Sequence, residues 1–155
     1  VVQAFPALVL VAAGAALAPP SALTAAFLIA LTGWPEIARL VRAEALRLSA
    51  SPHVEAARAA GASRSRVLFV HVLPGAIAPA IATTPYVLGG AVLLEASLSF
   101  LGLGAPPPSA SWGRALADAR ESLTTAWWCV VPPAVALFLL VLSARKLGEA
   151  LSESR

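Results

Sequence analysis

Four apolar stretches alternate with polar or turn-forming segments along the chain. They cover residues 1–18, 22–34, 67–94 and 126–142. The second continues as a helical pattern through Val41, and the Pro-Pro-Ser break at 19–21 predicts a helical hairpin with the first. A helix needs about 20 mostly apolar residues to cross a bilayer, so the first stretch falls slightly short. The pattern predicts an all-α polytopic membrane protein, a single transmembrane domain over residues 1–155 with about four transmembrane helices.

The composition supports a large lipid-facing surface. Hydrophobic residues make up 59% of the chain and charged residues 12%, whereas typical soluble domains have about 45–50% and about 25%. A net charge of +3, scattered along the chain, is too small to indicate nucleic acid binding. Cys129 is the single cysteine, so an intrachain disulfide is excluded. Val1 lies in an apolar run without a basic segment before it, so we expect an N-terminally truncated chain rather than a signal peptide.

The distribution of positive charge predicts the orientation in the membrane. Residues 39–71 contain six arginines, and three more basic residues follow residue 144. In residues 102–125 two arginines are offset by two acidic residues. Short loops rich in Lys and Arg stay in the cytoplasm. We therefore expect the 39–71 loop and the C-terminus in the cytoplasm, and the 102–125 segment on the periplasmic or extracellular side.

A short surface helix is predicted within the basic loop. Ser51 is a favoured N-cap, Pro52 suits the first helical position, and Glu55 in the first turn is favoured by the helix dipole. Four of the five residues after Glu55 are alanine, and Gly61 is suited to end the helix in a left-handed conformation. Ser63 is suited to cap a second helix that leads into the membrane. Because alanine offers little to bury in lipid, a surface that docks another protein fits better than a helix resting on headgroups.

These motifs resemble the EAA loop of ABC-importer permeases, in particular the second permease of dipeptide, oligopeptide and nickel importers. The loop has Glu-Ala-Ala at 55–57, Gly61 six positions after the glutamate, and Leu-Pro at 73–74. The segments that carry the resemblance extend over nearly the whole chain: 34–35, 38–42, 55–63, 71–74, 94–104, 107–108 and 111–113. The family's earlier membrane helices are missing. Gly75 replaces the usual asparagine, which predicts a looser start of the third membrane helix.

The resemblance implies a transmembrane permease subunit of an ATP-driven ABC importer for peptides or similar solutes. In that family the EAA helix couples the permease to a cytoplasmic ATPase. The coupling residues implied here are Glu55, Ala56, Ala57, Arg58, Ala60, Gly61 and Ser63. The implied partners are a second permease subunit in a heterodimer, two cytoplasmic ATP-binding subunits, an extracytoplasmic substrate-binding protein and the lipid bilayer of the inner membrane.

Four residues of the third apolar stretch are candidates for the pathway or for gating, namely Pro85, Gly89, Gly90 and Glu95. An ionisable residue inside a membrane is a functional hypothesis by default. Glu95 lies 22 positions after Leu73, about 33 Å along a helix, which is near the outer interface. For Glu95 we therefore favour a structural role near the 102–104 turn over substrate contact. For the two glycines we favour close helix packing over a hinge.

Other functions lack the residues that they require. His53 and His71 belong to no ligand cluster, so we expect neither a metal site nor a cofactor. The chain contains no Gly-x-x-x-x-Gly-Lys and no Gly-x-Ser-x-Gly segment, so it is not expected to be an enzyme and ATP hydrolysis is left to the partner subunits. The alternatives are a secondary transporter without an ATPase and a membrane-embedded enzyme or assembly factor. A secondary transporter is expected to place ionisable groups or broken helices at the membrane midplane.

Overall fold

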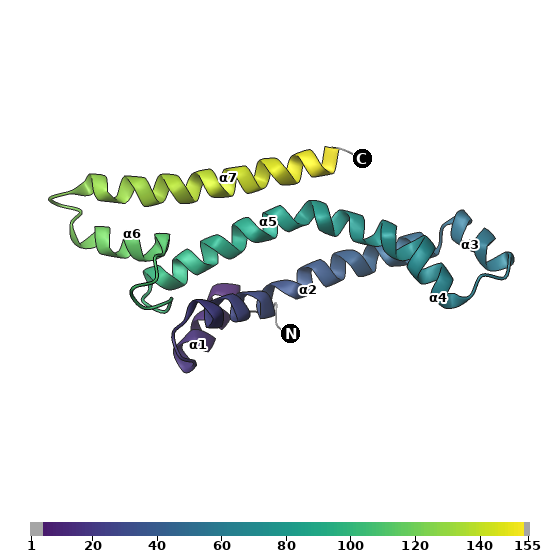
Figure 1. The fold of residues 1–155 in the computed structure, drawn as a ribbon, viewed down its shortest axis with the longest axis horizontal. Coiled ribbons are helices and arrows are strands. Elements are labelled where there is room, and N and C mark those ends of the chain that lie inside the picture. Colours follow the sequence, from purple (N-terminus) through teal and green to yellow (C-terminus); the bar gives the residue numbers. More distant parts are fainter. Residues whose placement is uncertain (1–4, 154–155) are drawn as a thin grey trace. The chain divides into compact units, whose positions relative to one another are not determined.

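The computed structural model describes residues 5–153, and the regular elements in this part are all helices. In chain order they are α1 (Ala7–Leu17), α2 (Ala22–Ser49), α3 (Pro52–Ala59), α4 (Arg64–Arg66), η2 (Val67–Val72), α5 (Leu73–Phe100), α6 (Trp112–Glu121), η3 (Trp127–Val130) and α7 (Val131–Glu153). The described residues fall into two compact units. The first lies within Val1–Gly33 and Tyr86–Lys146, and the second within Trp34–Pro85 and Leu147–Arg155. The long helices α2, α5 and α7, labelled in Figure 1, each contribute one part to each unit.

Three helical segments of the described chain are long and apolar enough to cross a membrane, namely Ala22–Ser49, Arg64–Phe100 and Trp127–Glu153. They confirm the predicted all-α polytopic class. The first apolar stretch, expected as a fourth crossing, forms α1, which has 11 residues. Such a helix is about 16 Å long, while the hydrocarbon core is about 30 Å thick. Within residues 5–153 the structure therefore has three candidate spans and one shorter apolar helix.

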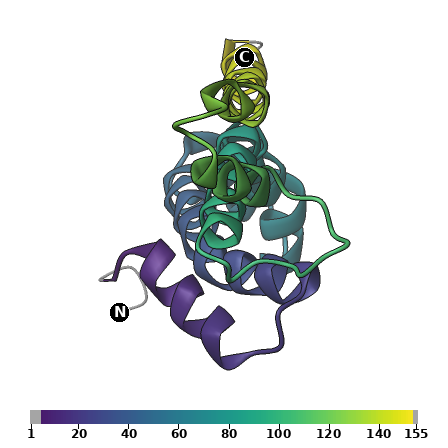
Figure 2. The same cartoon turned by 90° about the vertical axis from the view of Figure 1, so that its left-hand side faces the viewer.

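In the first unit, α1 and the start of α2 form the predicted hairpin (Figure 2). The connection is closed at Thr24, whose backbone N–H donates to Ser21 Oγ at 3.0 Å and whose hydroxyl donates to Pro19 O at 3.0 Å. A small core joins the hairpin to the end of α5, through the buried side chains Val11, Ala25 and Leu98. The sequence break therefore works as a capped turn, with the two arms held by apolar contacts.

In the second unit, a separate apolar cluster forms where α2 ends and the membrane-entering helix begins. Its buried members are Val54, Val67 and Val72, and its partly buried members are Ala45, Leu48 and Ala62. The elements α4, η2 and α5 follow one another without a break, so one continuous helical segment runs over Arg64–Phe100. Figure 1 shows α3 folded back beside the start of this segment.

Three helices extend further than the hydrophobic pattern predicts. α2 continues to Ser49, so residues 39–49 of the expected polar connection are helical. α5 continues to Phe100, and α7 passes through Arg145-Lys146 instead of ending there. Charged side chains end a membrane span without ending a helix, because the backbone keeps its own i to i−4 hydrogen bonds.

The prolines of the third apolar stretch lie inside an unbroken helix, with Pro79 and Pro85 both within α5. Each proline lacks an N–H, so a carbonyl four residues earlier loses its helical partner. Nearby, the Thr83 and Thr84 hydroxyls donate to the carbonyls of Pro79 and Ala80, each at 2.9 Å. The two threonine hydroxyls of this apolar segment are thus satisfied within the helix.

Candidate functional site

The surface helix predicted in the basic loop is present as α3 (Pro52–Ala59), with Pro52 and Glu55 in its first turn. Ser51 has the extended backbone of an N-cap residue, with φ −81° and ψ 148°, but its hydroxyl makes no cap bond. The hydroxyl donates instead to the carbonyl oxygen of Leu48 in the last turn of α2. Ser51 thus occupies the N-cap position but does not make the predicted side-chain cap bond, because its hydroxyl donates to a carbonyl at the end of α2 that also accepts the Ser51 N–H at 3.0 Å.

The end of α3 is fixed as predicted at Gly61, which has φ +84°. The Ala62 N–H donates to Ala57 O at 3.1 Å and the Gly61 N–H donates to Arg58 O at 3.0 Å. These two bonds are the pair that defines a Schellman motif, in which the left-handed residue is usually glycine. No atom lies within 4 Å of where a Gly61 Cβ would be, so the backbone angle rather than space requires glycine here.

The second predicted cap is also present, at Ser63. Its Oγ accepts the Arg66 N–H at 3.4 Å, and its backbone is extended, with φ −65° and ψ 156°. The helix that begins here leads through α4 and η2 into α5. The short helix α3 is therefore held between a chain reversal at one end and the start of a long helix at the other.

The seven predicted coupling residues lie on this loop and are mostly exposed. Ala57 is half-buried, and the exposed residues are Glu55, Ala56, Arg58, Ala60, Gly61 and Ser63. Within residues 5–153, neither Glu55 nor Arg58 forms an ion pair. The outer face of α3 thus combines small side chains with two exposed opposite charges. The role of these residues in coupling stays a prediction.

Val54 is the residue of this helix that sequence reasoning missed. Its side chain is 0% exposed and packs with Val67 and Val72. A signal for it was present, because Val54 is the one β-branched residue in Pro52–Ala59. A single larger apolar side chain on a short helix of small and polar residues marks the face that packs inward.

At the far end of α5, the Glu95 carboxylate accepts hydrogen bonds from two serines. The Ser99 hydroxyl donates to Glu95 Oε1 at 2.7 Å, and the Ser111 hydroxyl lies 3.1 Å from Oε1 and 3.3 Å from Oε2. Ser111 immediately precedes α6, so the carboxylate ties the start of α6 to α5. The geometry agrees with the favoured structural role of Glu95, and its use in a pathway or gate stays a prediction.

Glycines allow α6 and the preceding turn to lie directly against α5. Gly102, with φ +79°, ends α5 in a second Schellman motif, in which the Leu103 N–H donates to Leu98 O at 2.9 Å. A Cβ on Gly104 would lie 2.0 Å from Ser99 Oγ, and a Cβ on Gly113 would lie 1.8 Å from the Ala96 carbonyl oxygen. The hydrogen bonds of Glu95 and these close approaches together define an outer hairpin, residues 95–113.

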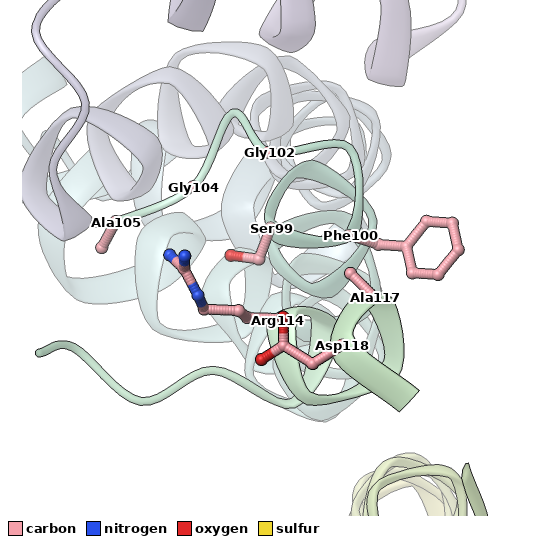
Figure 3. A pocket seen from close by; sticks show the side chains of 8 residues that line it. All are labelled: Ser99, Phe100, Gly102, Gly104, Ala105, Arg114, Ala117 and Asp118. Atoms are coloured by element: carbon pink, nitrogen blue, oxygen red, sulfur yellow. The ribbon is translucent and has the colours of Figure 1, made fainter. Parts of the chain in front are cut away.

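A hollow of about 150 Å³ lies beside the outer hairpin and is lined by Ser99, Phe100, Gly102, Gly104, Ala105, Arg114, Ala117 and Asp118. Figure 3 shows the Arg114 side chain reaching between Ser99 and Ala105, whereas the Phe100 ring points away. The guanidinium of Arg120 lies 5.8 Å from the centre of that ring, within the range of a cation–π contact. Charged residues of α6 thus line the hollow and contact the Phe100 ring.

The other candidate gating residues lie in α5. A Cβ on Gly89 would lie 3.5 Å from Ala144 Cβ in α7, whereas a Cβ on Gly90 would meet no atom within 4 Å. Gly89 thus fits the favoured packing role. Pro85 lies within the unbroken helix. A hinge at these residues stays a prediction.

These features define an α-helical, multi-pass membrane protein with a fixed surface helix in a basic loop. The chain belongs to the family of binding-protein-dependent transport system inner membrane components. The sequence model of that family matches residues 1–154.

Relatives in several bacteria are similar over nearly the whole chain. A Brucella suis biovar 1 protein named for a peptide transport system permease is 42% identical, over 97% of this chain and 51% of the relative. The dipeptide transport system permease protein DppC of Alkalihalophilus pseudofirmus is 36% identical, over 99% of this chain and 51% of its own length. The glutathione transport system permease protein GsiD of Salmonella typhimurium is 38% identical, over 99% of this chain and 51% of its own length. The chain thus spans about half the length of the curated relatives it matches.

Proposed function

We propose that this chain forms part of the permease of an ATP-driven ABC importer for peptides or similar solutes, and that α3 docks the cytoplasmic ATPase. Family membership supports the importer class. The names of the relatives, which refer to peptides, dipeptides and glutathione, support solutes with peptide bonds. The single observation that carries the docking assignment is the shape of α3, a short helix with both ends fixed and small residues on its exposed face.

The exposed face of α3 has the properties that a mechanical contact needs. Alanine side chains let a partner approach the backbone closely. Glu55 and Arg58 offer one acceptor and one donor for charge-assisted hydrogen bonds. Transmission of movement requires an element that has two discrete positions and does not deform between them. A helix closed by a Schellman motif at Gly61 suits that task.

In the proposed assembly the basic loop, residues 39–71, lies in the cytoplasm. There α3 seats on one of two ATP-binding subunits. A second permease subunit completes the pathway across the membrane. The outer hairpin and α6 face the substrate-binding protein on the other side. In this assignment the partner subunits hydrolyse ATP, and Pro85, Gly89 and Gly90 lie on the helix that moves. Glu95 holds the outer end of that helix to α6.

Co-purification tests the docking assignment. The full-length parent protein is expressed with its neighbouring genes, tagged and extracted in mild detergent. We expect an ATPase to be recovered with the native loop and lost with Glu55→Lys or Gly61→Asp, because both changes alter the α3 face without touching a membrane span. Asp118→Lys, an exposed charge reversal on α6, is the matched control and retains the ATPase. Failure of the intact, folded protein to bind any ATPase contradicts the proposal.

A further inference from the structure

The segment that joins the α3 loop to the membrane helix has an unusual hydrogen-bond register. Residues Val67–Val72 form a π-helix, and the Leu73 N–H that follows donates to Leu68 O, five residues back. α-Helical turns precede it in α4 and follow it in α5. Short π segments inside α-helices are rare and occur frequently at functional sites.

The π register determines which side chains face α3. Val67 and Val72 are five residues apart and are 5% and 2% exposed, while Val70 between them is 59% exposed. In an α-helix five residues correspond to about 500° of rotation, so the two valines would point about 140° apart. The i to i+5 bonding of a π-helix instead brings residues five apart to the same side. Both valines therefore pack with Val54 of α3.

This contact links three parts of the second unit. Val54 is the large apolar residue of α3, and the two η2 valines begin the membrane-entering helix. Leu48 from the last turn of α2 packs against the cluster. A Cβ on Gly75 would lie 2.8 Å from Leu48 Cδ1, so the missing side chain at that position leaves room for Leu48. Because Val54 is completely buried, α3 cannot slide along η2 without breaking the valine contact.

We propose that Val54, Val67 and Val72 are positioning residues, which make α3 and the beginning of the α5 segment move as one body, and that the π register of η2 is what lets both valines take part. This inference rests on the proposed docking of an ATPase on α3. It adds the residues through which a displacement of α3 reaches the membrane helix.

Cross-linking tests the geometry independently of any partner. In membranes that contain a cysteine-free form of the full-length parent, with Cys129→Ser, Val54→Cys is paired in turn with Val67→Cys and with Val72→Cys. A short bifunctional thiol reagent is expected to link both pairs. Val54→Cys with Val70→Cys is the matched control and stays unlinked. If one of the two pairs links no better than the control, η2 has an α register and the inference is overturned.

Transport measurements test the positioning role. In the reconstituted importer, Val54→Ala is expected to lower the amount of solute moved per ATP hydrolysed by about 2- to 30-fold, the range of measured coupling effects. The ATPase still co-purifies, because the exposed α3 face is unchanged. Val54→Ile and Val70→Ala are both expected to keep the native ratio of solute moved to ATP hydrolysed.

The outcomes separate this role from the proposed function. An unchanged ratio in Val54→Ala, with the ATPase bound, overturns the positioning role and leaves the docking assignment standing. Absence of any ATPase in the native preparation overturns both, while the cross-linking pattern still reports whether the three valines meet.

Discussion

The close approach of α6 to α5 at Gly113 gives a prediction whose size follows from the structure. A Cβ at residue 113 would lie 1.8 Å from the Ala96 carbonyl oxygen, whereas ordinary contacts begin near 3.4 Å. The obstacle is the backbone of a continuous helix, so it cannot rotate away as a flexible side chain does. Gly113→Ala therefore forces the start of α6 away from α5 by about 1.6 Å, the difference between the two distances.

Two costs accompany this displacement. Over-packing of a close contact typically costs about 1–3 kcal/mol. The same movement stretches the hydrogen bonds of Ser111 to Glu95, now 3.1 and 3.3 Å, and a bond to a charged group contributes about 1.5–3 kcal/mol. Because the loop partly relaxes, we expect a net loss of at least about 2 kcal/mol, the lower part of the combined range.

The assay is the thermal unfolding of the full-length parent protein in mild detergent. For a protein of the relatives' length, a loss of about 2 kcal/mol corresponds to a fall of about 3 °C in the unfolding temperature. Gly90→Ala is the matched control, because a Cβ there meets no atom within 4 Å and alanine favours a helix over glycine by up to about 1 kcal/mol. Equal unfolding temperatures for the two variants would refute the close approach of α6 to α5.

Three further predictions concern single contacts, all measured by the same unfolding assay. Glu95→Gln, which replaces the charged acceptor of the Ser99 and Ser111 bonds with a neutral one, and Ser111→Ala each destabilise the protein by about 1–2 kcal/mol. The double variant loses less than the sum of the two, because both changes affect the Ser111–Glu95 bond; additive losses would contradict this. Gly61→Ala costs about 1–2 kcal/mol because φ is +84°, while Gly61→Asn recovers most of it; equal effects would show that the left-handed angle is not required. Gly75→Ala changes stability by less than about 1 kcal/mol, because the Leu48 methyl group that it meets can rotate away; a larger loss would indicate a rigid contact.

Local sequence rules predicted the C-terminal end of the surface helix and the start of the next helix well. Gly61 and Ser63 act where the pattern placed them, because Schellman motifs and serine caps depend on a few adjacent residues. Ser51 is the N-cap residue but makes no side-chain cap bond, because its hydroxyl donates to Leu48 O instead. Which acceptor a hydroxyl chooses depends on where the preceding helix ends. The hydropathy pattern does not predict where α2 ends, because the helix continues to Ser49 through a polar region.

The contacts that hold the outer hairpin and those that hold α3 against η2 could not be predicted in the same way. The bond between Ser111 and Glu95 joins residues 16 positions apart, across a turn whose path no periodicity encodes. The π register of η2 is equally invisible, because Val67 and Val72 match no α-helical spacing. The sequence signal for the π register would have been a pair of β-branched residues five positions apart, next to a surface helix.

Site-specific photo-cross-linking tests the central claim, the docking of an ATPase on α3, most directly. A photoreactive residue is placed at Ala56 or Ala59, both exposed on α3, and at the exposed Ala115 of α6 as the control. The full-length parent is then irradiated in membranes that contain its ATP-binding partners. We predict an adduct with the ATPase from both α3 positions and none from Ala115. An ATPase adduct from Ala115 alone, or from none of the three positions in an assembled and active importer, would contradict the account.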